Sequence, residues 1–166
     1  IDPVILRNPN FAIALMLRAV FGILLFGALI LIPPYLQKVG GYPVIDAGLM
    51  LAPRGLATMA AAMIVGRLVR HVDPRLIIIF GAGIAGYSSW EMSLLPPDAP
   101  GSSILALILI QGVGTACFFI PLNALAFSTI GPDQLDQGTS FFALTGNIGR
   151  SIGIAILSSY LVRASQ

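Results

Sequence analysis

Hydrophobic residues in this chain gather into five long runs, separated by short links that contain polar residues, prolines or glycines. The runs cover residues 11–36, 44–69, 76–95, 103–130 and 139–162. A membrane-spanning helix needs roughly 20 mostly apolar residues, and each run reaches about that length. No run carries the polar face that a helix of a soluble bundle turns toward water. The pattern therefore predicts an all-α integral membrane protein with five transmembrane helices.

The composition supports this fold class. Of the 166 residues 57% are hydrophobic and only 10% are charged, and the mean hydropathy is +0.92. A soluble domain of this size needs far more charge on its surface. The net charge of +2 is better explained by loop charges that set the topology than by nucleic-acid binding. With one cysteine (Cys117) and one histidine (His71), we expect no disulfide framework within the chain, no metal site and no cofactor.

The largest cluster of basic residues lies in and beside the link between the second and third runs. Arg67, Arg70, His71 and Arg75 cannot all lie in hydrocarbon, so this link is expected in water or among lipid headgroups. Short loops rich in arginine lie on the cytoplasmic side of a membrane. Short links make consecutive helices antiparallel, which places the N-terminus on the same side. We therefore expect a multi-pass protein of the cell inner membrane, with the N-terminus and the 70–75 loop in the cytoplasm.

Three arginines lie deep inside the runs. At 1.5 Å per residue, Arg18 is about 12 Å into its run, Arg54 about 15 Å and Arg150 about 18 Å. A charge at such depth is costly and usually functional, although Arg18 could instead reach the membrane surface. We expect Glu91 to be the only carboxylate within a run. The acceptors for these arginines must then come from substrate, from water, or from helices outside this chain.

Uncharged polar side chains also occur within the runs. Gln111, Asn123 and Asn147 are candidates either for hydrogen bonds between helices or for lining a substrate path. Gly149 and Gly153 have the four-residue spacing that permits the backbone of another helix to approach closely. Together with Arg18, Arg54 and Arg150, the three amides form our set of candidate substrate-path or ion-pair residues. There is no pair of residues suited to enzyme catalysis, so we do not expect an enzyme.

Short motifs along the chain carry a family resemblance. They are NPNFAIAL (8–15), PYLQ (34–37), AGL (47–49), PRG (53–55), VGRL (65–68), DPR (73–75), QGVG (111–114), PL (121–122) and SIGIA (151–155). Their order resembles the C-terminal half of a major facilitator superfamily transporter, in particular the fourteen-helix drug:proton antiporter group of multidrug exporters. The matches cover nearly the whole chain.

The resemblance bears on the cytoplasmic loop motif, for which the candidate residues are Gly66, Arg67, Arg70, Asp73 and Arg75. In the family this loop has a glycine, an acid four positions later and then basic residues. Gly66 and Arg75 match that signature, whereas Arg70 stands where the acid is expected. The gating role of that acid is therefore not expected in this loop.

The resemblance also implies a function. The five runs would be the first five helices of the C-terminal domain of a proton-coupled multidrug or metabolite exporter that works by alternating access. Its partners would be the lipid bilayer, the missing N-terminal half of the same transporter, a small-molecule substrate and protons. The alternative is a non-transporting membrane subunit or scaffold, whose arginines pair with acids of a partner membrane protein.

Overall fold

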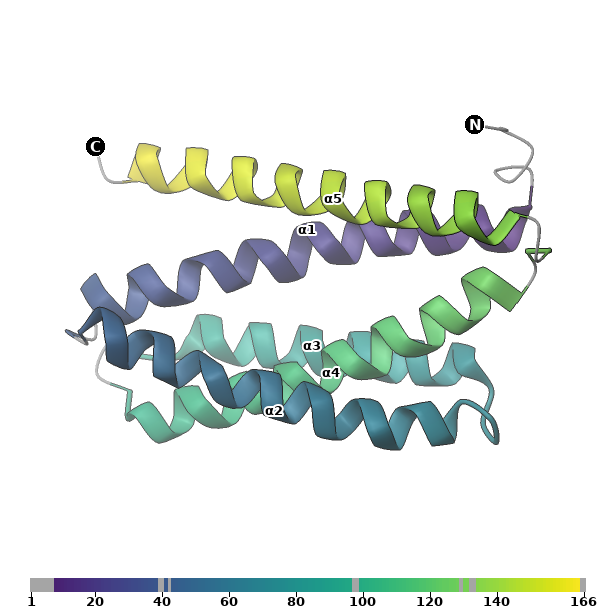
Figure 1. The fold of residues 1–166 in the computed structure, drawn as a ribbon. Coiled ribbons are helices and arrows are strands. Elements are labelled where there is room, and N and C mark those ends of the chain that lie inside the picture. Colours follow the sequence, from purple (N-terminus) through teal and green to yellow (C-terminus); the bar gives the residue numbers. More distant parts are fainter. Residues whose placement is uncertain are drawn as a thin grey trace. The chain divides into compact units, whose positions relative to one another are not determined.

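The computed structural model describes residues 8–38, 41, 43–96, 99–128, 130–131 and 134–164. These residues form five α-helices, one in each hydrophobic run, and the predicted all-α class is confirmed (Figure 1). The helices are α1 (Pro9–Lys38), α2 (Val44–Leu68), α3 (Pro74–Leu94), α4 (Gly101–Ser128) and α5 (Leu135–Ala164).

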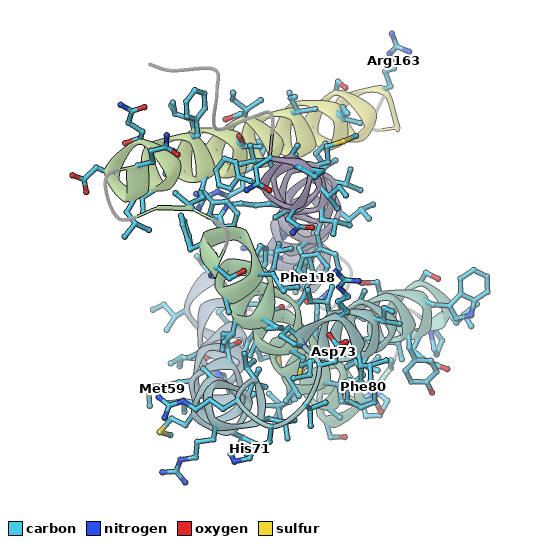
Figure 2. The ribbon with its side chains drawn as sticks, turned by 90° about the vertical axis from the view of Figure 1, so that its right-hand side faces the viewer. Met59, His71, Asp73, Phe80, Phe118 and Arg163 are labelled. Atoms are coloured by element: carbon cyan, nitrogen blue, oxygen red, sulfur yellow. The ribbon has the colours of Figure 1, made fainter. Side chains whose placement is uncertain are left out.

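Within the described part of the chain, α2 and α4 are long and apolar enough to cross a membrane. The most apolar stretch of α2 has a mean hydropathy of 1.5, and only 11% of it is buried inside the structure. An apolar helix with so little cover has its surface available to lipid or to another helix. Met59 of α2, which is 61% exposed, points outward in this way (Figure 2).

The chain divides into two units, which are described separately. The first consists of Ile1–Ile32 and Asn123–Gln166, and the second consists of Pro33–Leu122. The first unit therefore holds most of α1, the end of α4 and all of α5. The second holds α2, α3 and the larger part of α4.

In the first unit, α1 and α5 lie side by side (Figure 1), and the close approach predicted from the glycine spacing is confirmed. A Cβ atom added to Gly149 would lie 2.7 Å from the carbonyl oxygen of Ala19. A Cβ added to Gly153 would lie 2.6 Å from the carbonyl oxygen of Ile23. Real Cβ atoms essentially never come this close to backbone atoms, so only glycine fits at either position.

Three phenylalanine rings close one end of the first unit. The Phe127 and Phe142 rings meet edge to face, with their centroids 5.3 Å apart. The Phe11 ring lies 6.5 Å from each of them and is completely buried. Aromatic pairs at these separations stabilise a contact by about 0.5–1.5 kcal/mol beyond their buried area. The cluster ties the start of α1 to the end of α4 and the start of α5.

In the second unit, α4 presents glycines to both of its neighbours. A Cβ on Gly112 would lie 2.8 Å from the carbonyl oxygen of Arg54 on α2. A Cβ on Gly114 would lie 2.9 Å from the backbone nitrogen of Ala85 on α3. Gly81 of α3 is as tightly placed, since its Cβ would lie 2.6 Å from the backbone nitrogen of Phe118. The three helices are therefore packed nearly backbone to backbone.

The joint between α2 and α3 is the basic loop of the sequence. Arg67, Arg70, His71 and Arg75 are all exposed, as expected for a group of charges that must stay hydrated. Asp73 caps α3, because its side chain accepts a hydrogen bond of 2.9 Å from the backbone N–H of Arg75. Figure 2 shows His71 and Asp73 at this end of the unit.

Candidate functional site

The first unit brings three of the predicted polar residues together. Arg18 comes from α1, and Asn147 and Arg150 come from α5, where a turn of helix separates the last two. We call these residues the α1–α5 arginine site. Arg18 and Arg150 are half-buried, and Asn147 is exposed.

The Arg18 guanidinium lies against α5. Its Cζ atom is 4.1 Å from the centre of the Phe142 ring, which is a cation–π contact. The side chain also passes over Gly146, where an added Cβ would lie 2.5 Å from Arg18 Nε and 3.0 Å from its Nη2. The absence of a side chain at Gly146 therefore makes room for Arg18 between the two helices.

Arg150 is held by its own helix. Its Nε donates a hydrogen bond of 3.2 Å to the carbonyl oxygen of Gly146. Its Nη2 donates a second one, of 2.5 Å, to Oδ1 of Asn147. These two bonds hold the guanidinium against the preceding turn of α5.

Both guanidinium groups lie near Gly146, and their like charges interact unfavourably. Repulsion between like charges grows as water is excluded, so an apolar surrounding makes it stronger. An anion that bound both groups would relieve it, since guanidinium forks match carboxylate and phosphate oxygens. Chemically, the site suits an acidic group.

Arg54 and Gln111 belong to the second unit, which is described by itself. The Thr58 hydroxyl lies 2.8 Å from the carbonyl oxygen of Arg54 and 3.1 Å from that of Gly112, which joins α2 to α4. The Arg54 side chain is half-buried. Its backbone, rather than its charge, takes part in this contact.

Gln111 faces α3. It is completely buried, and its Nε2 donates a hydrogen bond of 3.3 Å to the hydroxyl of Ser89. Its Oε1 has no hydrogen-bond partner among the described residues. A buried amide oxygen without a partner is costly, so a bound water or a substrate donor would be favoured there. Asn123 is half-buried on α4.

The expectation that Glu91 is the only carboxylate within a hydrophobic run is wrong. Asp46 lies in the first turn of α2, where a negative charge is favoured by the helix dipole, and it is exposed. Glu91 is half-buried near the end of α3. Both acids lie near helix ends, and neither is on a helix of the α1–α5 arginine site.

Sequence reasoning missed Phe142 and Gly146, which position Arg18. The sequence did contain part of this information, because Gly146 and Arg150 are four residues apart and so share a face of the helix. That Arg18 lies over the same turn depends on how α1 and α5 are aligned, which no local pattern shows.

Comparison with known proteins identifies the family to which the chain belongs. Residues 2–154 match the family model of the Major Facilitator Superfamily. The chain is 30% identical over 162 residues to the multidrug export protein EmrB of Escherichia coli K12, which is 96% of this chain and 31% of that protein. It is 30% identical over 169 residues to a multidrug resistance protein B homolog of Mycobacterium tuberculosis, covering 97% of this chain and 30% of the homolog.

A third relative is the cephamycin export protein CmcT of Amycolatopsis lactamdurans, which is 31% identical over 124 residues, or 74% of this chain and 26% of that protein. The chain thus spans less than a third of the length of these curated relatives. The resemblance seen in the sequence motifs is confirmed, and the family consists of transporters rather than enzymes. This chain is a membrane protein that belongs to the Major Facilitator Superfamily.

Proposed function

We propose that this chain is part of a secondary active transporter that exports small molecules in exchange for protons and works by alternating access. The observation that carries the proposal is the α1–α5 arginine site. Two cations and an amide are gathered between helices of a membrane protein, where charge is costly and usually serves transport. The family and the relatives named for multidrug export support the same reading.

In this proposal the chain supplies the first five helices of a C-terminal transporter domain. All five helices cross the inner membrane, and the N-terminus and the basic loop between α2 and α3 lie in the cytoplasm. The other half of the transporter completes the substrate path. The rigid, glycine-packed contacts of each unit suit helices that move as bodies rather than bend individually.

The chemistry of the site extends the proposal to the substrate. Arg18 and Arg150 favour an acidic group, and the contact with the buried Phe142 ring holds the Arg18 guanidinium in place. We therefore expect the exporter to prefer lipophilic acids over neutral molecules of the same shape. Arg54, Gln111 and Asn123 are further candidates for the substrate path.

Everted membrane vesicles that contain the full-length protein test this function. With a proton gradient present, the vesicles should take up an aromatic carboxylic acid several times faster than its neutral amide. A protonophore should reduce uptake to the level of vesicles that lack the protein. Equal uptake with and without the protein would contradict the proposal. A dedicated partner protein that co-purifies in the absence of any flux would favour the non-transporting subunit.

A further inference from the structure

The second unit contains an open apolar groove between α2, α3 and α4, with a volume of about 490 Å³. Its lining consists of aliphatic, aromatic and thiol side chains: Ala61, Ile64, Val65, Leu68, Val72, Leu76, Ile77, Phe80, Val113 and Cys117. On α2 it extends over residues 61–68, a length of about 10 Å. Because these side chains offer almost no hydrogen-bonding groups, the groove suits a hydrocarbon chain.

One end of the groove runs into the basic loop. Three of the lining residues, Leu68, Val72 and Leu76, alternate along the chain with the arginines of the loop. Arg67 precedes Leu68, Arg70 lies two residues before Val72, and Arg75 precedes Leu76. All three arginines are exposed. Apolar and cationic surfaces therefore meet at this end, which faces the viewer in Figure 2 with His71, Asp73 and Phe80 labelled.

The contacts within the loop leave it with an excess of positive charge. Asp73 is its one acid, and it caps α3 through the backbone N–H of Arg75. The ring of His71 lies 3.1 Å from the carbonyl oxygen of Arg67 through Nδ1, which must donate because a carbonyl only accepts. Neither contact neutralises an arginine side chain. The guanidinium groups can therefore turn toward an anion at the mouth of the groove.

We propose that the groove and the basic loop together bind an anionic phospholipid. One acyl chain lies in the groove between α2 and α3, and the headgroup phosphate pairs with Arg67, Arg70 and Arg75. Basic pockets between transmembrane helices bind anionic headgroups through the same combination of burial and charge. Arg70 attracts the headgroup phosphate, whereas an acid at that position would repel it.

The test uses the full-length protein, purified in detergent and mixed with equal amounts of phosphatidylglycerol and phosphatidylcholine that carry identical acyl chains. Native mass spectrometry counts the molecules of each lipid that stay bound. We expect at least about tenfold preference for phosphatidylglycerol in the unaltered protein. Arg70→Gln should weaken this binding about fivefold, which corresponds to about 1 kcal/mol.

Two further variants separate the parts of the site. Leu76→Trp fills the groove from an exposed position, so it should reduce the retention of both lipids. Arg163→Gln makes the same charge change as Arg70→Gln on α5, which does not line the groove, and it should have no effect. Because these side chains are on the surface, none of the changes should prevent folding.

The proposal is overturned by equal retention of the two lipids, or by an Arg163→Gln effect as large as that of Arg70→Gln. It is also overturned if inorganic phosphate displaces phosphatidylglycerol, since the loop would then be a site for the free ion. Unchanged retention of both lipids in Leu76→Trp would exclude the groove as the place of the acyl chain.

Discussion

Arg150→Ala is expected to reduce proton-driven efflux by the full-length protein about 10–100-fold, while the protein remains as abundant in the membrane as the unaltered form. A hydrogen bond to a charged group is worth about 1.5–3 kcal/mol, and that loss corresponds to this range of rates. Abundance should be preserved because Arg150 is half-buried rather than fully buried, and two of its hydrogen bonds, to Gly146 and Asn147, are made within its own helix. Efflux in everted vesicles, divided by the amount of protein on immunoblots, measures the effect.

Two control variants make this prediction specific. Arg150→Lys keeps the charge but loses the planar fork, so part of the activity should return. Arg163→Ala removes an exposed arginine in the last turn of the same helix and should leave efflux unchanged. Full efflux by Arg150→Ala at normal abundance would contradict the prediction, because the charge of Arg150 would then have no role in transport.

The double variant Gly149→Ala and Gly153→Ala is expected to destabilise the protein strongly. Each added methyl group would lie within 2.7 Å of a carbonyl oxygen of α1, and backbone cannot move aside as a flexible side chain can. Overpacking costs about 1–3 kcal/mol per site, and here it exceeds the helix propensity of about 0.5–1 kcal/mol that alanine adds. The midpoint of thermal unfolding of the purified protein should fall by several degrees.

The matched control is the double variant Gly83→Ala and Gly86→Ala in α3. A Cβ at either position has open space around it within the described part of the chain. Only the gain in helix propensity then remains, so the unfolding midpoint should stay the same or rise. If both double variants lowered the midpoint equally, the close contact between α1 and α5 would not be the cause.

Hydropathy alone predicted where the helices lie, because runs of about 20 apolar residues have few other stable forms in a membrane. The exposed basic loop followed from the cost of burying several arginines together. Gly149 and Gly153 were predicted to permit a close contact, but the sequence did not show that Ala19 and Ile23 are the partners. Spacing within one helix reveals which residues share a face, and it does not reveal what that face meets.

The glycines of α3 show this limit most clearly. Gly81, Gly83 and Gly86 look alike in the sequence, yet among the residues that the structure describes only Gly81 lies against another helix, where its added Cβ would clash with α4. The candidate polar residues also differ in what they contact. Arg18 and Arg150 come together over Gly146, whereas Gln111 is buried against Ser89 in the other unit. These differences depend on the rotation of each helix about its axis, which is set by contacts distant in sequence.

We infer that the α1–α5 arginine site binds the acidic substrate during transport. Asn147 is exposed and touches Arg150, so Asn147→Cys, in a full-length protein without other cysteines, places a reactive thiol beside the site. The rate of its alkylation by a water-soluble maleimide is the most direct measurement. We predict that an aromatic carboxylic acid slows alkylation severalfold and that its neutral amide does not. Equal alkylation rates with the acid, with the amide and with neither would contradict the claim.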